Sequence, residues 1–226
     1  MKRFQENETF ENVIQPSRDE VISGFSLAGN WKTFFKNDNP IVLELGCGKG
    51  EYSVALGREN PDKNFIGIDI KGARFWRGAK TALEEGLSNV AFLRTQIELI
   101  DQCFGVDEVS EIWITFPDPQ AKKRRQKKRL PGAHFLNMYR AFLKDGGRIH
   151  LKTDNLQLYQ DTLELVLYNK LDVEHRSTDV YSEGWNDERD SIQTYYEKRF
   201  LSEGIKINYL CFRLPAGKKI RELPHE

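Results

Sequence analysis

A single aspartate, Asp118, stands between two prolines and shortly before a dense run of positive charge. The preceding apolar residues 112–116 (IWITF) have the character of a buried strand that the prolines bring to an end. Seven of the eight residues from Lys122 to Arg129 are lysine or arginine. Ligands of open α/β sheets bind outside the carboxyl ends of the strands, where Asp118 would lie. A carboxylate flanked by cations at that place indicates chemistry on a polyanionic substrate.

This basic run concentrates the positive charge of the chain. The sequence has 34 lysine and arginine residues and 34 aspartate and glutamate residues, so its formal net charge is zero. Without the seven cations of the run, 27 basic residues would face 34 acidic ones. A localised basic patch is typical of phosphate binding. Taken by itself, the run fits a solvated loop equally well.

A glycine-rich loop follows the apolar residues 41–45. Gly46, Gly48 and Gly50 permit a tight turn and the close approach of a ligand to the main chain. The third glycine comes one residue earlier than in the dinucleotide-binding pattern G-x-G-x-x-G. Asp69 follows 19 residues after Gly50 and is placed to accept hydrogen bonds from ribose hydroxyls. The alternative is that the glycines only shape a turn between a strand and a helix.

Two further side chains bear on the kind of cofactor. The carboxylate of Glu44, at the opening of the loop, would repel a pyrophosphate but suits a ligand with an ammonium and a sulfonium. S-adenosylmethionine carries both cations. Gln96, which follows the apolar residues 90–93, can offer a donor and an acceptor to an adenine edge. On the sequence alone, Gln96 could as well be an exposed residue at the start of a helix.

These residues must be positioned by alternating strands and helices. Apolar runs predict strands at 41–45, 65–69, 90–93 and 111–116, from 149 onward, within 171–181, and at 206–212. Helical spacing predicts helices at 31–35, 49–60, 73–85, around 135–143, and at 156–168 and 195–203. Such alternation predicts right-handed βαβ units on a mainly parallel sheet.

Length and composition predict one domain, residues 40–226, preceded by an N-terminal extension, residues 1–39. No apolar run approaches the roughly 20 residues of a membrane span, and the N-terminus lacks the apolar core of a secretory signal. Cys47, Cys103 and Cys211 are far apart and are expected to be reduced thiols of a cytoplasmic protein. The four histidines have no metal-ligand spacing, so no metal is expected.

Several motifs occur together in a familiar order. They are LELGCGKG at 43–50, GID at 67–69, FPDP at 116–119 with the basic run after it, HLKTD at 150–154 and TYYE at 194–197. In this respect the chain resembles the bacterial tRNA (guanine-N7)-methyltransferases of the TrmB type over about three quarters of its length. The FPDP element with its basic run is the more specific part, because most class I methyltransferases share the glycine loop.

The resemblance implies a class I, Rossmann-like methyltransferase fold: seven strands, mostly parallel with the last one antiparallel, and helices on both faces. Together with the glycine loop, it implies that S-adenosylmethionine is bound by Glu44, Gly46, Gly48, Asp69, Gln96 and Asp118. Asp118 would also be the catalytic residue. By the same resemblance, the tRNA would be bound by Lys122, Asp154, Thr194, Tyr196 and Glu197. The charge of the basic run predicts that residues such as Lys127, Lys128 and Arg129 bind its phosphates.

The chain departs from the family pattern at two positions. Gln120 stands where the family commonly has tryptophan, and Gln96 where it commonly has aspartate. Without the resemblance, Asp154 would be interpreted as the cap of a helix that begins near Asn155, and Glu197 as a carboxylate on a helix surface.

The implied reaction is methylation of guanine 46 in the tRNA variable loop at N7. Guanine N7 carries an unprotonated lone pair, so its attack on the methyl group requires no general base. We therefore expect Asp118 to orient the base and to stabilise the positive charge that develops on it. The alternative is a class I methyltransferase that acts on another RNA or on protein. We expect a monomer or a homodimer that contacts no membrane.

Overall fold

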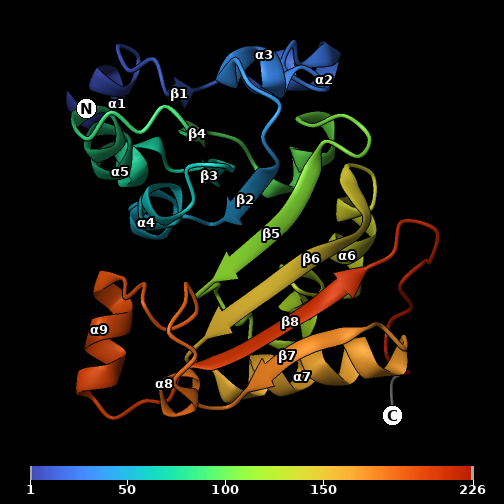
Figure 1. Cartoon of the computed structure of the whole chain (residues 1–226). Helices are drawn as coiled ribbons and strands as arrows, with labels where there is room; N and C mark the ends of the chain where they lie inside the picture. The colour runs from blue at the N-terminus through green and yellow to red at the C-terminus, as the bar shows by residue number, and fades with distance from the viewer. Residues whose placement is uncertain (1, 225–226) are drawn as a thin grey trace.

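The computed structural model describes residues 2–224, which form an eight-stranded sheet with helices on both faces (Figure 1). The strands are β1 (Val13–Ile14), β2 (Ile41–Leu45), β3 (Asn64–Ile68), β4 (Val90–Leu93), β5 (Val109–Thr115), β6 (Leu143–Thr153), β7 (Val173–Ser177) and β8 (Asn208–Leu214). Their order is β1-β4-β3-β2-β5-β6-β8-β7, and β8 runs antiparallel to both of its neighbours, β6 and β7.

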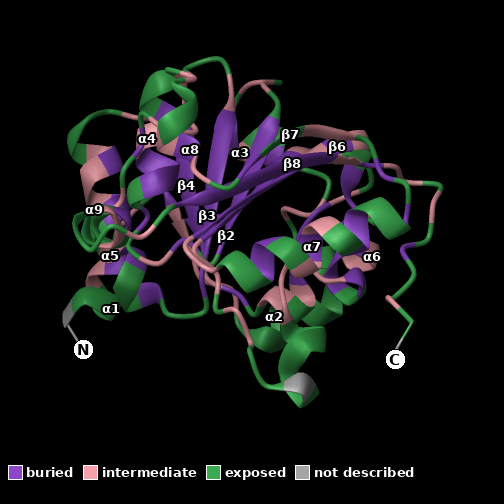
Figure 2. Cartoon of the chain, turned by 90° about the horizontal axis from the view of Figure 1, so that it is seen from below, coloured by how far each residue is buried: buried purple, intermediate pink, exposed green. Residues whose placement is uncertain are grey.

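Helices cover the sheet on both faces and leave its central strands buried (Figure 2). They are α1 (Lys2–Asn7), α2 (Arg18–Gly24), α3 (Trp31–Phe35), α4 (Glu51–Glu59), α5 (Gly72–Glu84), α6 (Ala133–Tyr139), α7 (Leu156–Tyr168), α8 (Val180–Glu183) and α9 (Tyr195–Ser202), with the short 3₁₀ helices η1 (Ile97–Gln102) and η2 (Lys123–Lys128). One apolar cluster joins the sheet to α4 and α5, and the other joins it to α6 and α7. All five residues of β2 are buried, because a central strand is covered on both sides.

The predicted fold class is confirmed, with differences in detail. The eighth strand is β1, whose two residues pair with β4 at the edge of the sheet and are too few to give a sequence pattern. β6 begins at Leu143 instead of near residue 149, because Val109 of β5 pairs with Leu143 before the glycine pair at 146 and 147. The sixth predicted strand occupies residues 173–177, within the predicted range, and the last lies two residues further on than predicted.

Residues 2–39 pack against the rest of the chain. The Trp31 side chain is fully buried, donates a hydrogen bond to the carbonyl oxygen of Cys103 at 2.9 Å and stacks on Phe104. The Glu108 carboxylate accepts hydrogen bonds from the main-chain N–H of Gly29 and Trp31. The division of the chain at residue 40 stays a prediction.

The three cysteines are buried free thiols. Among residues 2–224, no helix has the length and apolar character that crossing a membrane requires.

Candidate active site

Most of the predicted site residues lie along one edge of the sheet. The strands β4, β3, β2, β5 and β6 are adjacent and parallel, so their carboxyl ends point the same way. Glu44 is in β2, Asp69 directly follows β3, and Asp154 directly follows β6. The segments after β4 and β5 carry Gln96 and Asp118. Residues far apart in the sequence are thereby brought to one edge, where open α/β sheets bind ligands.

The glycine loop owes its shape to backbone conformation. Gly46 and Gly48 have φ angles of +74° and +56°, in the left-handed region that favours glycine. The main-chain N–H groups of Gly46 and Cys47 both donate to the carbonyl oxygen of Ile68, at 2.8 and 3.0 Å. A Cβ atom added to Gly46 would meet no other atom within 4 Å. The main chain is therefore open to a ligand at this point.

The Asp69 carboxylate fixes the loop from the neighbouring strand. Its two oxygens accept hydrogen bonds from the N–H groups of Gly48, at 3.1 Å, and of Lys71, at 2.8 Å. Each oxygen keeps a second lone pair with which it can accept from a ribose hydroxyl. Gln96 is exposed at the start of η1 and makes no side-chain capping bond there.

Glu44 is a buried carboxylate held only by neutral donors. It accepts hydrogen bonds from the N–H and hydroxyl groups of Ser53 on α4 and from the hydroxyl group of Thr115 at the end of β5. Burial raises the pKa of Glu44 from 4.5 to about 7, against the lowering effect of these hydrogen bonds. Ser53 and Thr115 were not predicted as site residues, because neither forms part of the glycine pattern.

The buried carboxylate of Glu197 is neutralised by a lysine, and the contrast with Glu44 indicates what Glu44 is suited to bind. Glu197 forms an ion pair with Lys152 at 2.7 Å, whereas the described residues provide no ion pair to Glu44. A buried charge is stable only when it is paired. A cationic ligand such as S-adenosylmethionine would supply the missing charge, so the residues present fit that cofactor. No group of three or more potential ligands in residues 2–224 is arranged to hold a metal ion.

The loop after β5 presents Asp118 to solvent through an unusual backbone. Phe116 and Gln120 both have φ angles of +47°, a left-handed conformation that residues other than glycine rarely adopt. The Asp118 carboxylate accepts a hydrogen bond from the N–H of Gln120 at 3.0 Å. The Gln120 side chain is half-buried. The strained turn therefore keeps an exposed carboxylate beside the carboxyl end of β5.

Arg129 differs from the rest of the basic run. Its Nε donates to the carbonyl oxygen of Pro119 at 2.9 Å, and its Nη1 contacts Asp161 of α7 at 2.6 Å. Lys122, Lys127 and Lys128 are exposed. The guanidinium of Arg129 thus holds the turn that carries Asp118 against α7, a role that the charge pattern did not reveal.

Replacing Arg129 by alanine is expected to act on turnover more than on tRNA binding. Without the guanidinium, the turn loses its tether, and Asp118 is no longer held in one position. We expect kcat to fall by about tenfold to a hundredfold, with little change in the salt dependence of tRNA affinity. Single-turnover rates and tRNA binding at several salt concentrations would test this. A variant with normal kcat and a reduced salt dependence would instead identify Arg129 as a phosphate contact.

Three of the remaining predicted tRNA contacts lie at the start of α9, and the fourth, Asp154, directly follows β6. Thr194 caps α9 and forms a reciprocal capping box with Glu197. Tyr196 is exposed. Asp154 is half-buried, and the cap of α7 is Asn155, so the interpretation of Asp154 as a helix cap is wrong. Glu197 is completely buried, so its interpretation as a surface carboxylate is wrong as well.

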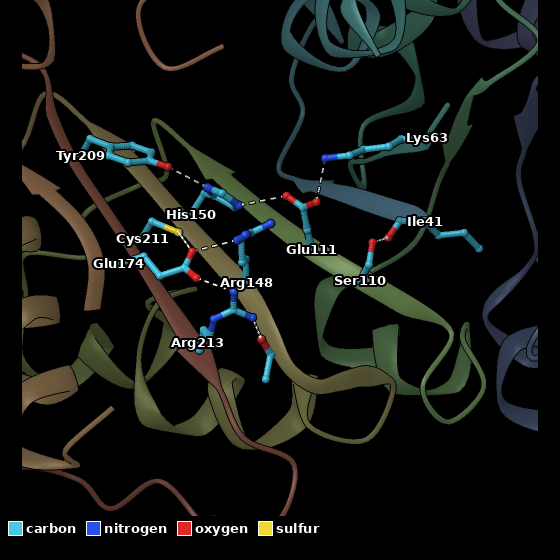
Figure 3. A network of polar contacts seen from close by, with 11 residues as sticks. Ile41, Lys63, Ser110, Glu111, Arg148, His150, Glu174, Tyr209, Cys211 and Arg213 are labelled. Carbon is cyan, nitrogen blue, oxygen red and sulfur yellow. Dashed lines mark hydrogen bonds and ion pairs between the residues drawn. The ribbon is translucent and has the colours of Figure 1, made fainter. Parts of the chain in front are cut away.

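A polar network braces the strands behind this edge (Figure 3). His150 of β6 lies between the Tyr209 hydroxyl, at 2.8 Å, and the Glu111 carboxylate, at 3.2 Å. Trp113 stacks on the His150 ring with a centroid distance of 4.0 Å. Lys63 completes the network with an ion pair to Glu111 at 2.8 Å. Burial lowers the pKa of His150, and its ring packs between the strands of the sheet.

Comparison with known proteins agrees with this geometry. A family model described as a putative methyltransferase matches residues 38–210. The tRNA (guanine-N(7)-)-methyltransferase of Christiangramia forsetii is 58% identical over 217 residues, covering 95% of this chain and 97% of that protein. The protein of the same name from Porphyromonas gingivalis is 56% identical, covering 92% of this chain and 86% of that protein.

Solved structures with low sequence identity share the fold. An antibiotic-related methyltransferase has a TM-score of 0.60 at 17% identity and covers 90% of this chain and 96% of its own. The 16S rRNA methyltransferase KamB has a TM-score of 0.52 at 16% identity, with coverage of 78% and 88%. These likenesses confirm the class I methyltransferase fold. Because the sequence identities with the two relatives exceed 50% over nearly the whole chain, the chain belongs to the tRNA (guanine-N7)-methyltransferase family.

Proposed function

We propose that this protein methylates N7 of guanine 46 in the variable loop of tRNA. Its family supports S-adenosylmethionine-dependent N7-methylation of a tRNA guanine. The observation that carries the proposal is the position of Asp118. This exposed carboxylate lies at the same sheet edge as Glu44, which lacks a cationic partner among the described residues, and just before the exposed lysines of the basic run.

The cofactor supplies an electrophilic methyl group on a sulfonium. We assign its binding to the residues that the sequence predicted. The open main chain at Gly46 and Gly48 allows close approach, and Asp69 has lone pairs left for ribose hydroxyls. Glu44 provides negative charge for the cationic part, and the exposed amide of Gln96 is available to adenine.

Asp118 acts on the guanine as a hydrogen-bond acceptor and a charge. N7 of a nucleoside has no proton to lose, so no general base is needed. Asp118 can accept hydrogen bonds from N1–H and the exocyclic amine of the base, which fixes the orientation of N7. The same carboxylate stabilises the positive charge that moves to the purine during transfer.

Residues of the basic run, together with residues that follow β6 and begin α9, would hold the tRNA. Lys122, Lys127 and Lys128 face solvent. Tyr196 is exposed as well, and Asp154 and Thr194 are half-buried. The Tyr196 ring is 52% exposed and could stack on an unpaired base. Arg129 and Glu197 are already paired inside the protein. A contact of Arg129 with tRNA stays a prediction of the charge pattern, and a contact of Glu197 stays a prediction of the resemblance.

Methyl transfer can be mapped directly. The protein is incubated with labelled S-adenosylmethionine and an unmodified tRNA transcript, and the labelled nucleoside is identified and placed in the sequence. We expect N7-methylguanosine at position 46 and no label in a transcript whose guanine 46 is replaced by adenine. Label at another position, or on protein, would contradict the proposal.

Replacing Lys127 and Lys128 together by serine should weaken tRNA binding and its salt dependence. Each lysine that neutralises a phosphate releases counterions on binding. Losing two contacts should reduce the slope of log affinity against log salt by about 1.4 to 1.8. Filter binding at several salt concentrations would measure the slope. Serine at Lys144 and Lys219, exposed lysines away from the site, is the matched control. An unchanged slope for Lys127 and Lys128 would mean that this segment is only a solvated loop.

A further inference from the structure

The ion pair between Lys152 and Glu197 is the most deeply buried one in the described part of the chain. Both side chains have zero exposure, and Lys152 Nζ lies 2.7 Å from the Glu197 carboxylate. Lys152 belongs to β6 and stands two residues before Asp154. Glu197 is in the first turn of α9. The pair therefore ties the first turn of α9 to the carboxyl end of a central strand, where α8 and α9 lie in Figure 1.

Lys152 and Glu197 also form hydrogen bonds with other residues. The Tyr181 hydroxyl donates to the same Glu197 oxygen at 2.6 Å. The other Glu197 oxygen accepts from the N–H of Thr194 at 3.4 Å, as part of the capping box. Lys152 Nζ also donates to the carbonyl oxygen of Ile192 at 3.1 Å. Both oxygens of the Glu197 carboxylate therefore have partners within the protein.

The opposite side of the same turn faces the cofactor loop and solvent. The N–H of Tyr195 donates to the carboxylate of Glu51, the first residue of α4, at 3.0 Å. The Lys49 ammonium lies over the Tyr195 ring at 4.0 Å. Tyr195 and Tyr196 remain more than half exposed. The turn is therefore held between β6 and the glycine loop, and it presents its aromatic residues outward.

A buried ion pair is weak evidence for stability, because two apolar side chains of similar size often serve as well. Removing only one partner, however, leaves an uncompensated buried charge that must move or take up water. Since Glu197 begins the helix that carries Tyr196, such a movement would displace the exposed residues of that turn. The ion pair therefore affects the position of surface residues such as Tyr196, although its own two side chains are buried.

We infer that Lys152 is a positioning residue for tRNA binding, which acts by holding Glu197 and thereby the turn from Thr194 to Tyr196, whose two tyrosines are exposed. The inference rests on the proposed function, since it takes that turn to contact tRNA. It assigns to Glu197 an indirect effect on tRNA, in place of the direct contact that the family resemblance implies. Lys152 itself touches neither substrate nor cofactor.

A double-mutant cycle separates the indirect role from the direct one. The variants are Lys152→Met, Glu197→Leu and the two together, with Lys144→Met as a control at an exposed lysine of the same strand. We expect each single variant to raise KM and Kd for tRNA about tenfold while kcat changes less than about threefold. In the double variant no charge is left unpaired, so both constants should return to within about threefold of the unmodified protein.

Two results would overturn the inference. If the double variant binds tRNA as poorly as Glu197→Leu, the Glu197 carboxylate contacts the RNA itself. If Lys152→Met is folded and binds tRNA normally, Lys152 positions nothing. Tyr181→Phe keeps both charges and removes one hydrogen bond to Glu197. It therefore tests the positioning role even if the charge variants do not fold. Its Kd for tRNA should rise about twofold to threefold, and an unchanged Kd would contradict the inference.

Different measurements test the proposed methyl transfer and the positioning role of Lys152. Failure of the proposed function would appear in the unmodified protein, as absence of N7-methylguanosine from the tRNA product. Failure of the positioning role would appear only in the variants, as an unaffected or unrescued Kd for tRNA. Thermal unfolding of every variant distinguishes loss of binding from loss of the folded state.

Discussion

Asparagine in place of Asp118 is expected to lower kcat by about 10²- to 10³-fold, the usual effect of removing one preorganised electrostatic contact from an active site. Asparagine keeps the size of the side chain and an oxygen to accept the hydrogen bond from Gln120. It removes the negative charge. Its NH₂ group would also place hydrogen-bond donors opposite the N–H donors of guanine. Both effects raise the barrier for methyl transfer.

The affinity for tRNA should change much less, because phosphate contacts supply most of it. Single-turnover methylation with labelled S-adenosylmethionine, beside equilibrium binding of tRNA, measures the two quantities separately. Asp62→Asn, at an exposed aspartate in the turn before β3, is the matched control and should leave both unchanged. Full turnover by Asp118→Asn, with normal tRNA binding, would show that Asp118 neither orients nor stabilises the base.

Replacing Glu44 by glutamine is expected to stabilise the protein at pH 8 and to weaken its binding of S-adenosylmethionine. Burial raises the pKa of Glu44 from 4.5 to about 7, so the folded state favours the protonated carboxyl group. The stability that this group contributes is complete below pH 4.5 and is lost as the pH rises through about 7. Above that range the charged form costs about 3 kcal/mol, an amount that glutamine would restore.

The hydrogen bonds around Glu44 can accommodate the amide. Its oxygen can accept from the N–H of Ser53, and its NH₂ group can donate to the Thr115 hydroxyl, which is free to rotate. The cofactor cation, however, loses the charge that faces it. We expect the dissociation constant for S-adenosylmethionine at pH 8 to rise about tenfold to a hundredfold, a typical size for a partly screened charge pair.

Unfolding free energies and cofactor binding measured between pH 5 and pH 8 would test both effects. In the unmodified protein, binding should strengthen as the pH rises through about 7, because ionised Glu44 attracts the cation. Glu111→Gln is an informative contrast: burial acts to raise the pKa of Glu111, but hydrogen bonds from His150 and Lys63 outweigh it and lower the pKa. Ionised Glu111 therefore stabilises the fold above pH 4.5, and its replacement should destabilise at pH 8. A loss of stability in Glu44→Gln would contradict the proposed cost of its charge.

The order of strands and helices and the groups at the sheet edge could be predicted from the sequence, because these features have local causes. Alternation of apolar runs with helical spacing indicates βαβ units, and parallel strands then bring Glu44, Asp69 and Asp118 to one edge. The left-handed turns at Gly46 and Gly48 follow from the absence of a Cβ atom. Strand β1 lies outside this rule, since two residues form a strand only because β4 offers an open edge.

Which charges are free to bind a ligand depends on contacts between residues far apart in the sequence. Arg129 and Lys128 are adjacent cations, yet Asp161 on a distant helix pairs with Arg129 and leaves Lys128 in solvent. Glu44 and Glu197 are both buried, yet only Glu197 meets a lysine. The sequence alone determines the kinds of groups and the edge they share. Their roles depend on partners far along the chain, because a charge is neutralised only by what the fold packs against it.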